Sequence, residues 1–215
     1  MGVKLGKLEK ELKYYLDRKS YERLLKICGK KILKRDQLIT YFFDDKKLNL
    51  RKNRFGFRLR TNGGRAATLT LKYPDKRASK GPAGFKVRRE FEVRIPLTKA
   101  KDVLKGKLPV YELKAAPIRV LKRHFRKDYL EKIRLLGAMK TRRTLARLDP
   151  NFRVEIDKYE FFGKRFYELE LETDRPHEAA DTVREWLKSH DIPYIPLVQS
   201  KLSRFLDAWQ KQKRR

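Results

Sequence analysis

The sequence predicts an α+β fold in which eight antiparallel strands form a curved sheet or a closed barrel flanked by helices. Three observations support this prediction. Apolar and polar residues alternate with a period of two in eight segments, turn residues join most neighbouring segments in hairpin order, and helical periodicity appears near the start, the middle and the end of the chain.

The first half of the chain contains five predicted strands and one clear helix. Ser20 opens the helix after Asp17, and its apolar residues recur at helical spacing until Gly29, a typical C-terminal stop. The clearest hairpin turns through Thr61-Asn62-Gly63-Gly64, and a basic loop rich in Pro and Gly precedes the fifth strand. These predicted strands cover residues 7–15, 34–45, 54–60, 67–72 and 85–95.

The second half begins with a segment of short helices, residues 98–137, broken by glycine and proline. Three more strands follow, at residues 138–149, 152–159 and 167–172. Two amphipathic helices end the chain, the first capped around Asp174-Arg175-Pro176 and the second starting near Val198.

The polar faces of the predicted strands carry full charges sorted by sign. Helices need an apolar sheet surface to pack on, so the charged faces are expected to point into an enclosed lumen. Charges in such a lumen are tolerated only when they are paired or bound to a ligand. An open sheet with a solvated charged face remains the alternative. The acidic pairs are Glu9/Glu11, Glu90/Glu92, Glu155/Asp157 and Glu168/Glu170, and the basic residues are Lys13, Arg58, Arg60 and Lys72.

Composition narrows the class of partner. The 215 residues include 57 Lys and Arg against 27 Asp and Glu, a formal charge of +30 that attracts polyanions. The single cysteine, Cys28, indicates a reducing compartment and a buried structural thiol. No stretch approaches the ~18 apolar residues of a membrane span. These features predict one domain over residues 1–215 in a cytoplasmic protein that does not enter a membrane; they leave its oligomeric state open.

An ordered set of motifs resembles a known family. Glu9-x-Glu11-x-Lys13 is similar to the ExExK signature of the CYTH, or triphosphate tunnel metalloenzyme, superfamily. The motifs that follow in the same order are Tyr41-Phe42-Phe43-Asp44, Arg58-Leu59-Arg60, Thr68-Leu69-Thr70-Leu71-Lys72, Arg89-Glu90-Phe91-Glu92, Arg142-Arg143, Asp157, Glu168-Leu169-Glu170 and Ser200-Lys201.

The resemblance implies an eight-stranded tunnel that binds a triphosphate together with Mg²⁺ or Mn²⁺. The implied metal ligands are Glu9, Glu11, Asp157, Glu168 and Glu170, and the implied triphosphate contacts are Lys13, Arg58, Arg60, Lys72, Arg142 and Lys201. Arg143 is the alternative to Arg142 because the two face opposite sides of the strand. Either Glu90 or Glu92 matches the carboxylate of the fifth strand, and Glu155 is a further candidate.

The activity implied by the resemblance is metal-dependent release of orthophosphate from a triphosphate. Inorganic tripolyphosphate leads as the substrate, ahead of thiamine and nucleoside triphosphates, with Glu11 and Lys13 at the catalytic centre and Lys13 orienting the attacking water. A class IV adenylate cyclase or an RNA triphosphatase is the alternative within the family. From another class, the basic segments 74–84 and 119–134 would suit a non-catalytic protein that binds polyphosphate or, weakly, nucleic acid.

Overall fold

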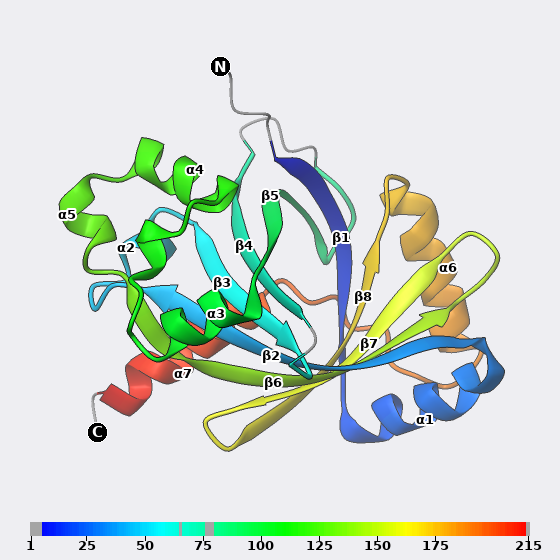
Figure 1. Ribbon diagram of the computed structural model, residues 1–215. Coiled ribbons are helices and arrows are strands. Elements are labelled where there is room, and N and C mark those ends of the chain that lie inside the picture. Colours follow the sequence, from blue (N-terminus) through cyan, green and yellow to red (C-terminus); the bar gives the residue numbers. More distant parts are fainter. Residues whose placement is uncertain (1–5, 65, 76–79, 214–215) are drawn as a thin grey trace. The chain divides into compact units, whose positions relative to one another are not determined.

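The computed structural model describes residues 6–64, 66–75 and 80–213 (Figure 1). Its eight antiparallel strands follow the order β1-β5-β4-β3-β2-β6-β7-β8 in a closed barrel, which confirms the predicted fold class. The strands are β1 (Lys7–Leu16), β2 (Ile32–Asp44), β3 (Gly56–Asn62), β4 (Ala66–Pro74), β5 (Phe85–Ile95), β6 (Arg134–Arg147), β7 (Arg153–Phe161) and β8 (Lys164–Glu172).

Seven α-helices and two short 3₁₀ turns lie between or after the strands within the residues described. The 3₁₀ turns cover Gly29–Lys31 and Val110–Glu112. The helices are α1 (Arg18–Cys28), α2 (Asn49–Lys52), α3 (Leu97–Leu104), α4 (Ala116–His124), α5 (Lys127–Leu130), α6 (Pro176–Lys188) and α7 (Lys201–Lys213).

Several predicted boundaries were wrong by a few residues. Strand β6 begins at Arg134 and includes Gly137, so the predicted helical segment ends earlier than residue 137. Glycine breaks helices more reliably than strands, and reading Gly137 as a boundary hid the start of this strand. Strand β8 begins at Lys164, and α7 at Lys201 rather than near Val198.

The caps of α1 agree with the prediction. The carboxylate of Asp17 accepts a hydrogen bond from the backbone N–H of Ser20 at 2.7 Å, and the N–H of Gly29 donates to the carbonyl of Leu25. In contrast, no side chain caps α6, so Asp174 does not have the predicted role there.

The chain divides into two compact units. The first unit contains Met1–Leu8, Leu38–Lys76 and Arg88–Met139, and the second contains Glu9–Gln37, Arg77–Val87 and Lys140–Arg215. In the first unit, one face of the β3–β4 hairpin packs on α3 and α4. The buried residues of this contact include Phe57, Leu59, Leu69, Leu71, Val103, Ile118 and Leu121.

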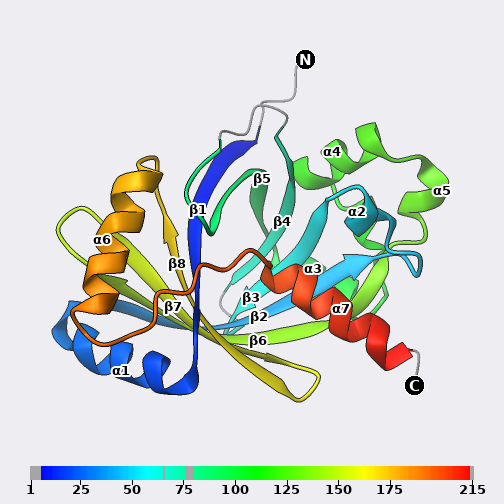
Figure 2. The same cartoon turned by 180° about the vertical axis from the view of Figure 1, so that it is seen from behind.

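In the second unit, α1 and α6 cover one face of β1, β7 and β8 (Figure 2). The strands contribute Leu12, Tyr14, Ile156, Leu169 and Leu171, and the helices contribute Leu24, Cys28, Val183 and Leu187. The Cys28 thiol is buried, as the sequence predicted. Because side chains alternate along a strand, the residues between these apolar ones form a second face, turned away from α1 and α6.

Among the described residues, no helix combines the length and hydropathy needed to cross a bilayer.

Candidate functional site

Strand register aligns the charged residues of the second unit in two rows. Along the first row, Arg143 of β6 lies opposite Asp157 of β7, which lies opposite Glu168 of β8. Along the second row, Glu155 of β7 lies opposite Glu170 of β8. Glu170 in turn lies opposite Lys13 of β1. The hairpins therefore place charges of opposite sign side by side on one sheet face.

This charged face is buried, like the apolar face behind it. Asp157 and Glu168 are 0% exposed, and Glu9, Glu11, Lys13, Glu170 and Lys201 are all below 9%. Ionised groups buried to this extent need paired charges or a bound ion. A solvated outer face is therefore excluded for the buried carboxylates of β1, β7 and β8, which are Glu9, Glu11, Asp157, Glu168 and Glu170.

Arg143 binds three carboxylates at once. Its Nε and Nη2 donate to the two oxygens of Asp157 at 2.9 and 2.6 Å. Nη2 also lies 3.1 Å from Glu170, and Nη1 pairs with Glu155. The planar guanidinium matches the paired oxygens of a carboxylate, which makes such contacts strong and directional.

Two lysines complete the inner part of the cluster. The Lys13 ammonium lies 2.5 Å from Glu170 and 3.2 Å from Glu11. The Lys201 ammonium, at the start of α7, lies 2.7 Å from Asp157, 2.6 Å from Glu168 and 2.9 Å from Glu170. The cluster formed by Lys13, Arg143, Lys201 and the carboxylates that they contact is called the ionic cluster below.

Two residues of the cluster's edge were missed by sequence reasoning. Tyr159 donates its hydroxyl hydrogen to Glu168 at 2.8 Å, and Arg204 donates to the same hydroxyl oxygen at 2.5 Å. A signal for both was present. Tyr159 lies two residues after Asp157 on a strand, so the two side chains share a face. Arg204 lies three residues after Lys201 on a helix, so these two side chains also share a face.

The cations keep two of the carboxylates ionised. Burial alone would raise the pKa of Glu170, but Lys13, Lys201 and Arg143 outweigh burial and hold the pKa well below its usual range. Burial likewise opposes ionisation of Asp157, yet Arg143 and Lys201 lower its pKa.

The two other carboxylates shift the opposite way. Burial raises the pKa of Glu155 to about 7, and burial also raises the pKa of Glu168. For the lysines, burial favours the neutral amine, but the surrounding carboxylates raise the pKa of both Lys13 and Lys201 above its usual value. The ionic cluster therefore holds firmly charged cations beside carboxylates of unequal proton affinity.

Three carboxylates are close enough to share one cation. One oxygen each from Glu155, Asp157 and Glu170 lie within 4.8 Å of one another. Hard oxygen donors in this arrangement fit Mg²⁺ or Mn²⁺, which prefer carboxylates. The structure thus groups two of the predicted ligands with Glu155. Glu168 instead contacts Lys201 and Tyr159, while Glu9 and Glu11 lie buried on β1 outside this group of three.

The preference for Arg142 over Arg143 requires correction. Arg142 is exposed and lies opposite Lys158 across the β6–β7 pair, on the face that bears α1. Its charge acts on Tyr21 of α1 and on Lys158 rather than on the ionic cluster. Arg143, and not Arg142, faces the carboxylates of the ionic cluster.

The first unit carries a polar face of its own. Arg58 and Lys72 lie 3.4 and 3.6 Å from the same oxygen of Glu90, and the Nε of Arg60 donates to Thr40 at 3.2 Å. The side chains of Arg58, Lys72 and Glu90 are only 15–21% exposed. The predicted basic residues of β3 and β4 therefore gather around one carboxylate.

Of the two β5 carboxylates, Glu90 is the one that meets these cations. Glu92 is exposed and accepts a hydrogen bond from Thr70 at 3.2 Å. The sequence left open whether Glu90 or Glu92 is the fifth-strand carboxylate. In the structure, Glu90 is the one that lies beside Arg58 and Lys72.

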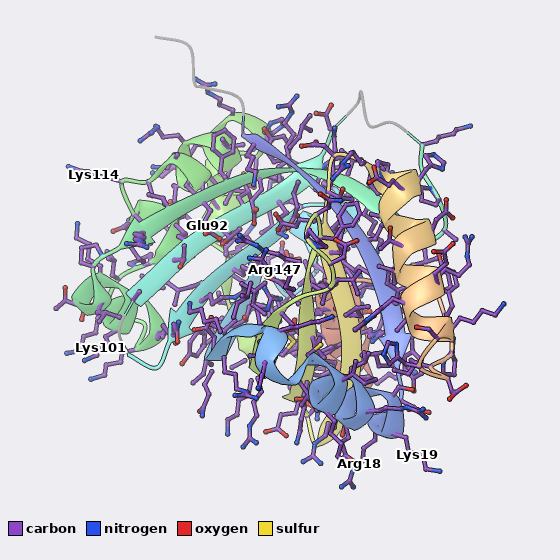
Figure 3. All side chains as sticks on the ribbon, turned by 90° about the vertical axis from the view of Figure 1, so that its right-hand side faces the viewer. Arg18, Lys19, Glu92, Lys101, Lys114 and Arg147 are labelled. Carbon is purple, nitrogen blue, oxygen red and sulfur yellow. The ribbon has the colours of Figure 1, made fainter. Side chains whose placement is uncertain are left out.

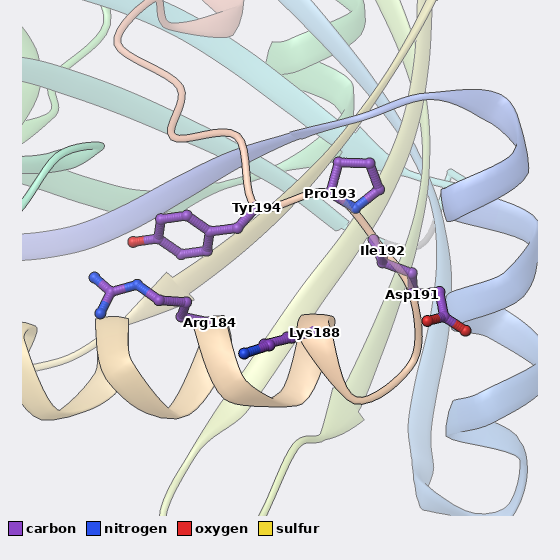
Figure 4. A pocket seen from close by; sticks show the side chains of 6 residues that line it. All are labelled: Arg184, Lys188, Asp191, Ile192, Pro193 and Tyr194. Atoms are coloured by element: carbon purple, nitrogen blue, oxygen red, sulfur yellow. The ribbon is translucent and has the colours of Figure 1, made fainter.

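A separate pocket lies at the C-terminal end of α6 (Figure 4). It has a volume of about 460 Å³ and is lined by Arg184, Lys188, Asp191, Ile192, Pro193 and Tyr194. Since none of the predicted site residues lines it, this pocket is distinct from the ionic cluster.

Comparison with protein families identifies the chain's relatives. The CYTH domain model matches residues 7–206, which includes most of both units and all of the predicted site residues. The chain belongs to the CYTH family. A comparison of this CYTH protein with curated proteins finds no match.

Solved structures share the fold at low sequence identity. A candidate adenylyl cyclase from Hippeastrum with a dominant triphosphatase activity has a TM-score of 0.82 at 22% identity, covering 93% of this chain and 96% of its own. A candidate adenylate cyclase from Bacillus halodurans has a TM-score of 0.69 at 21% identity, covering 91% and 95%. The PH1819 protein from Pyrococcus horikoshii has a TM-score of 0.58 at 18% identity, covering 93% and 99%.

Proposed function

We propose that this CYTH protein is a divalent-metal-dependent hydrolase that cleaves the terminal phosphoanhydride of triphosphates, with inorganic tripolyphosphate as the preferred substrate. The observation that carries the proposal is the ionic cluster, in which three carboxylates within 4.8 Å of one another lie beside buried cations. Membership of the CYTH family and the dominant triphosphatase activity of the Hippeastrum protein support it.

The proposed chemistry divides between metal and protein. When bound, Mg²⁺ or Mn²⁺ would offset negative charge on the phosphates and lower the pKa of the attacking water. Glu155, Asp157 and Glu170 would hold it, with Glu9, Glu11 and Glu168 as the further ligands that the family resemblance implies. Water attacks the terminal phosphorus, the phosphoanhydride bond breaks, and orthophosphate and pyrophosphate are released from tripolyphosphate.

The basic residues would position the phosphates and offset their charge. Lys13, Arg143 and Lys201 supply such cations in the second unit. Arg58, Arg60 and Lys72 remain proposed phosphate contacts in the first unit. We assign Lys13 to orienting the attacking water, because Lys13 directly contacts Glu11 and Glu170.

We further propose that residues 1–215 act as one domain, which the extent of the family match supports. A cytoplasmic location is likewise proposed, in keeping with the single free thiol.

A phosphate-release panel tests the function. Tripolyphosphate, nucleoside triphosphates, thiamine triphosphate and triphosphorylated RNA would each be incubated with Mg²⁺ or Mn²⁺ and with a chelator. We expect the fastest release from tripolyphosphate and none with the chelator. Formation of cyclic AMP and pyrophosphate from ATP would instead establish the cyclase alternative, and triphosphorylated RNA as the best substrate would establish an RNA triphosphatase.

Glu170→Gln tests the assignment of the site. Replacing this carboxylate should lower kcat/KM on the order of 10²-fold or more, since a positioned charge is lost. The matched control is Glu178→Gln on α6, an exposed residue that forms an ion pair with Arg175 and should retain full activity when replaced. Equal activity of Glu170→Gln and the parent protein would contradict the proposal.

The high positive charge favours a second candidate of a different class, a non-catalytic protein that binds polyphosphate or RNA. Basic side chains such as Lys101, Lys114, Arg18 and Lys19 project outward from the fold (Figure 3). Binding through such residues weakens steeply with salt. Salt-sensitive retention of RNA, together with no chelator-sensitive phosphate release from any substrate, would favour this candidate over the hydrolase.

A further inference from the structure

The ammonium of Lys201 is held by three carboxylates. It donates a hydrogen bond to Asp157 and forms ion pairs with Glu168 and Glu170. In the structure it lies 2.6–2.9 Å from three carboxylate oxygens, one each from Asp157, Glu168 and Glu170. To contact a triphosphate, Lys201 therefore has to exchange carboxylates for phosphate oxygens.

Protein cations also engage the three carboxylates that would hold a metal. Lys201 contacts Asp157 and Glu170, and Arg143 contacts these two and Glu155. A divalent ion that entered the group would meet carboxylates already compensated by the protein. The ammonium and the metal ion thus compete for the same oxygens.

The formal charges show what each ligand would do alone. With every group ionised, five carboxylates face four cations in and beside the ionic cluster, which leaves one net negative charge. A dication alone would make the cluster net positive and leave a displaced ammonium buried without a partner. A triphosphate alone would add several negative charges. Together, the dication offsets part of the triphosphate's charge, and each displaced cation gains a phosphate partner. The residues counted are Glu11, Glu155, Asp157, Glu168, Glu170, Lys13, Arg143, Lys201 and Arg204.

We propose that Lys201 is an internal counter-cation that occupies the metal site's carboxylates until a metal–triphosphate complex arrives, and that it then exchanges these carboxylates for phosphate oxygens. This inference rests on the proposed function for the identity of its ligands. Its consequence is that the protein binds the metal ion poorly by itself, and that metal and triphosphate favour each other's binding.

Binding measurements with Lys201→Met test this exchange without relying on turnover. Mn²⁺ affinity in the absence of any phosphate would be measured by electron paramagnetic resonance. The affinity for an imido analogue of tripolyphosphate, which resists hydrolysis, would be measured by calorimetry in the presence of a chelator. Removing the competing ammonium should tighten binding of Mn²⁺ alone by about tenfold or more, and should weaken binding of the analogue alone by a similar factor.

The matched control is Lys211→Met, the same charge removal at an exposed position of α7. It should change neither affinity more than about twofold, since exposed charges interact weakly at this range. A lysine that serves only as a phosphate contact would weaken the analogue in Lys201→Met but leave Mn²⁺ affinity unchanged. An unchanged or weakened Mn²⁺ affinity in folded Lys201→Met therefore overturns the proposal.

Removing a buried charge can prevent folding, so circular dichroism would accompany each measurement and Lys201→Gln would serve as a second variant with the same expectation. Should neither fold, the parent protein decides. Millimolar affinity for Mn²⁺ without phosphate supports the exchange, whereas submicromolar affinity contradicts it. Phosphate release is read separately. Tightened Mn²⁺ binding in a protein that hydrolyses no triphosphate would sustain the exchange and refute the hydrolase.

Discussion

Arg143 holds Asp157 through two parallel hydrogen bonds, from Nε at 2.9 Å and Nη2 at 2.6 Å, and the two residues are direct register partners across β6 and β7. The geometry uses the fork of the guanidinium, which lysine lacks. The sheet thereby fixes the orientation of a carboxylate that belongs to the proposed metal site.

Arg143→Lys is therefore expected to be costly although it preserves charge. We expect kcat/KM for tripolyphosphate to fall on the order of 10²-fold because Asp157 loses its alignment. The free energy of unfolding should fall by about 1–3 kcal/mol. Arg142→Lys, one residue earlier at an exposed side chain on the face that bears α1, is the control and should alter neither quantity. If the Arg142 variant were the impaired one, our assignment of the sixth-strand arginine would be wrong.

Tyr159→Phe removes one hydroxyl and keeps the ring that stacks on Phe161 and Phe166. Glu168 then loses a donor and Arg204 loses an acceptor. We expect unfolding in urea to require about 1–3 kcal/mol less free energy, since buried groups that lose hydrogen bonds keep their desolvation cost. Tyr129→Phe, at an exposed ring of α5, is the control. Equal stability of the two variants would mean that the hydroxyl bridge contributes nothing.

Gly84 positions the backbone that carries Lys13. Its carbonyl accepts a hydrogen bond from the N–H of Lys13 at 3.2 Å, its φ is +85°, and an added Cβ would lie 2.6 Å from the carbonyl oxygen of Lys13. The free energy of unfolding of Gly84→Ala should thus be about 1–3 kcal/mol lower than that of the parent, because of backbone strain and the collision of the new Cβ. It should also lower activity by displacing Lys13.

Gly106→Ala separates the two effects on stability. Gly106 has a similar φ of +72° but open space around the position of its Cβ. Its variant bears the conformational strain without the collision. A melting temperature as low as that of Gly84→Ala would show that the contact with Lys13 has no energetic weight.

The cap of α1 predicts an acid-dependent loss of stability. The N–H of Ser20 lowers the pKa of Asp17, so the folded state favours the carboxylate. This stabilisation is present above the unfolded pKa, about 3.9, and is lost as the pH falls through the lower folded pKa. Asp17→Ala should cost about 1 kcal/mol near neutral pH and less in acid.

Urea unfolding of Asp17→Ala and of the parent, each measured near neutral pH and in acid, checks this expectation. The control is Asp174→Ala, because Asp174 precedes α6 without capping it and pairs at the surface with Lys10. The difference in the free energy of unfolding between Asp17→Ala and the parent should shrink in acid. A difference that instead grew in acid would contradict this prediction.

Local pattern was sufficient to predict the strands and the sorting of charges by face. Apolar and polar residues alternate through the β3–β4 hairpin, and also in β5 with Arg89 as the exception, so one register places the apolar residues of these strands on one face. The choice between Arg142 and Arg143 failed because the two adjacent arginines offer the same charge to opposite faces. Ala146 and Leu148, which join the apolar core, could have decided it, since Ala146 shares the parity of Arg142.

In contrast, which charged side chains contact one another depends on distances that the pattern along a strand does not contain. The sequence predicted Asp157, Glu168 and Glu170 as equivalent ligands. In the structure, Asp157 and Glu170 form a group with Glu155, whereas Glu168 accepts a hydrogen bond from Tyr159, whose hydroxyl is in turn bound by Arg204 of α7. That contact joins residues 45 positions apart in the chain.

Each inner side chain of the ionic cluster compensates the charge of several others. A single substitution there therefore leaves a buried neighbour with fewer ion-pair partners. Lys201 forms ion pairs with three carboxylates, and Arg143 also forms ion pairs with three. Sequence change that preserves stability at these positions should then come as concerted replacement, in which an acid and a base disappear together and leave an apolar pair of similar volume. Natural variants of this chain would be expected to differ here by whole pairs or not at all.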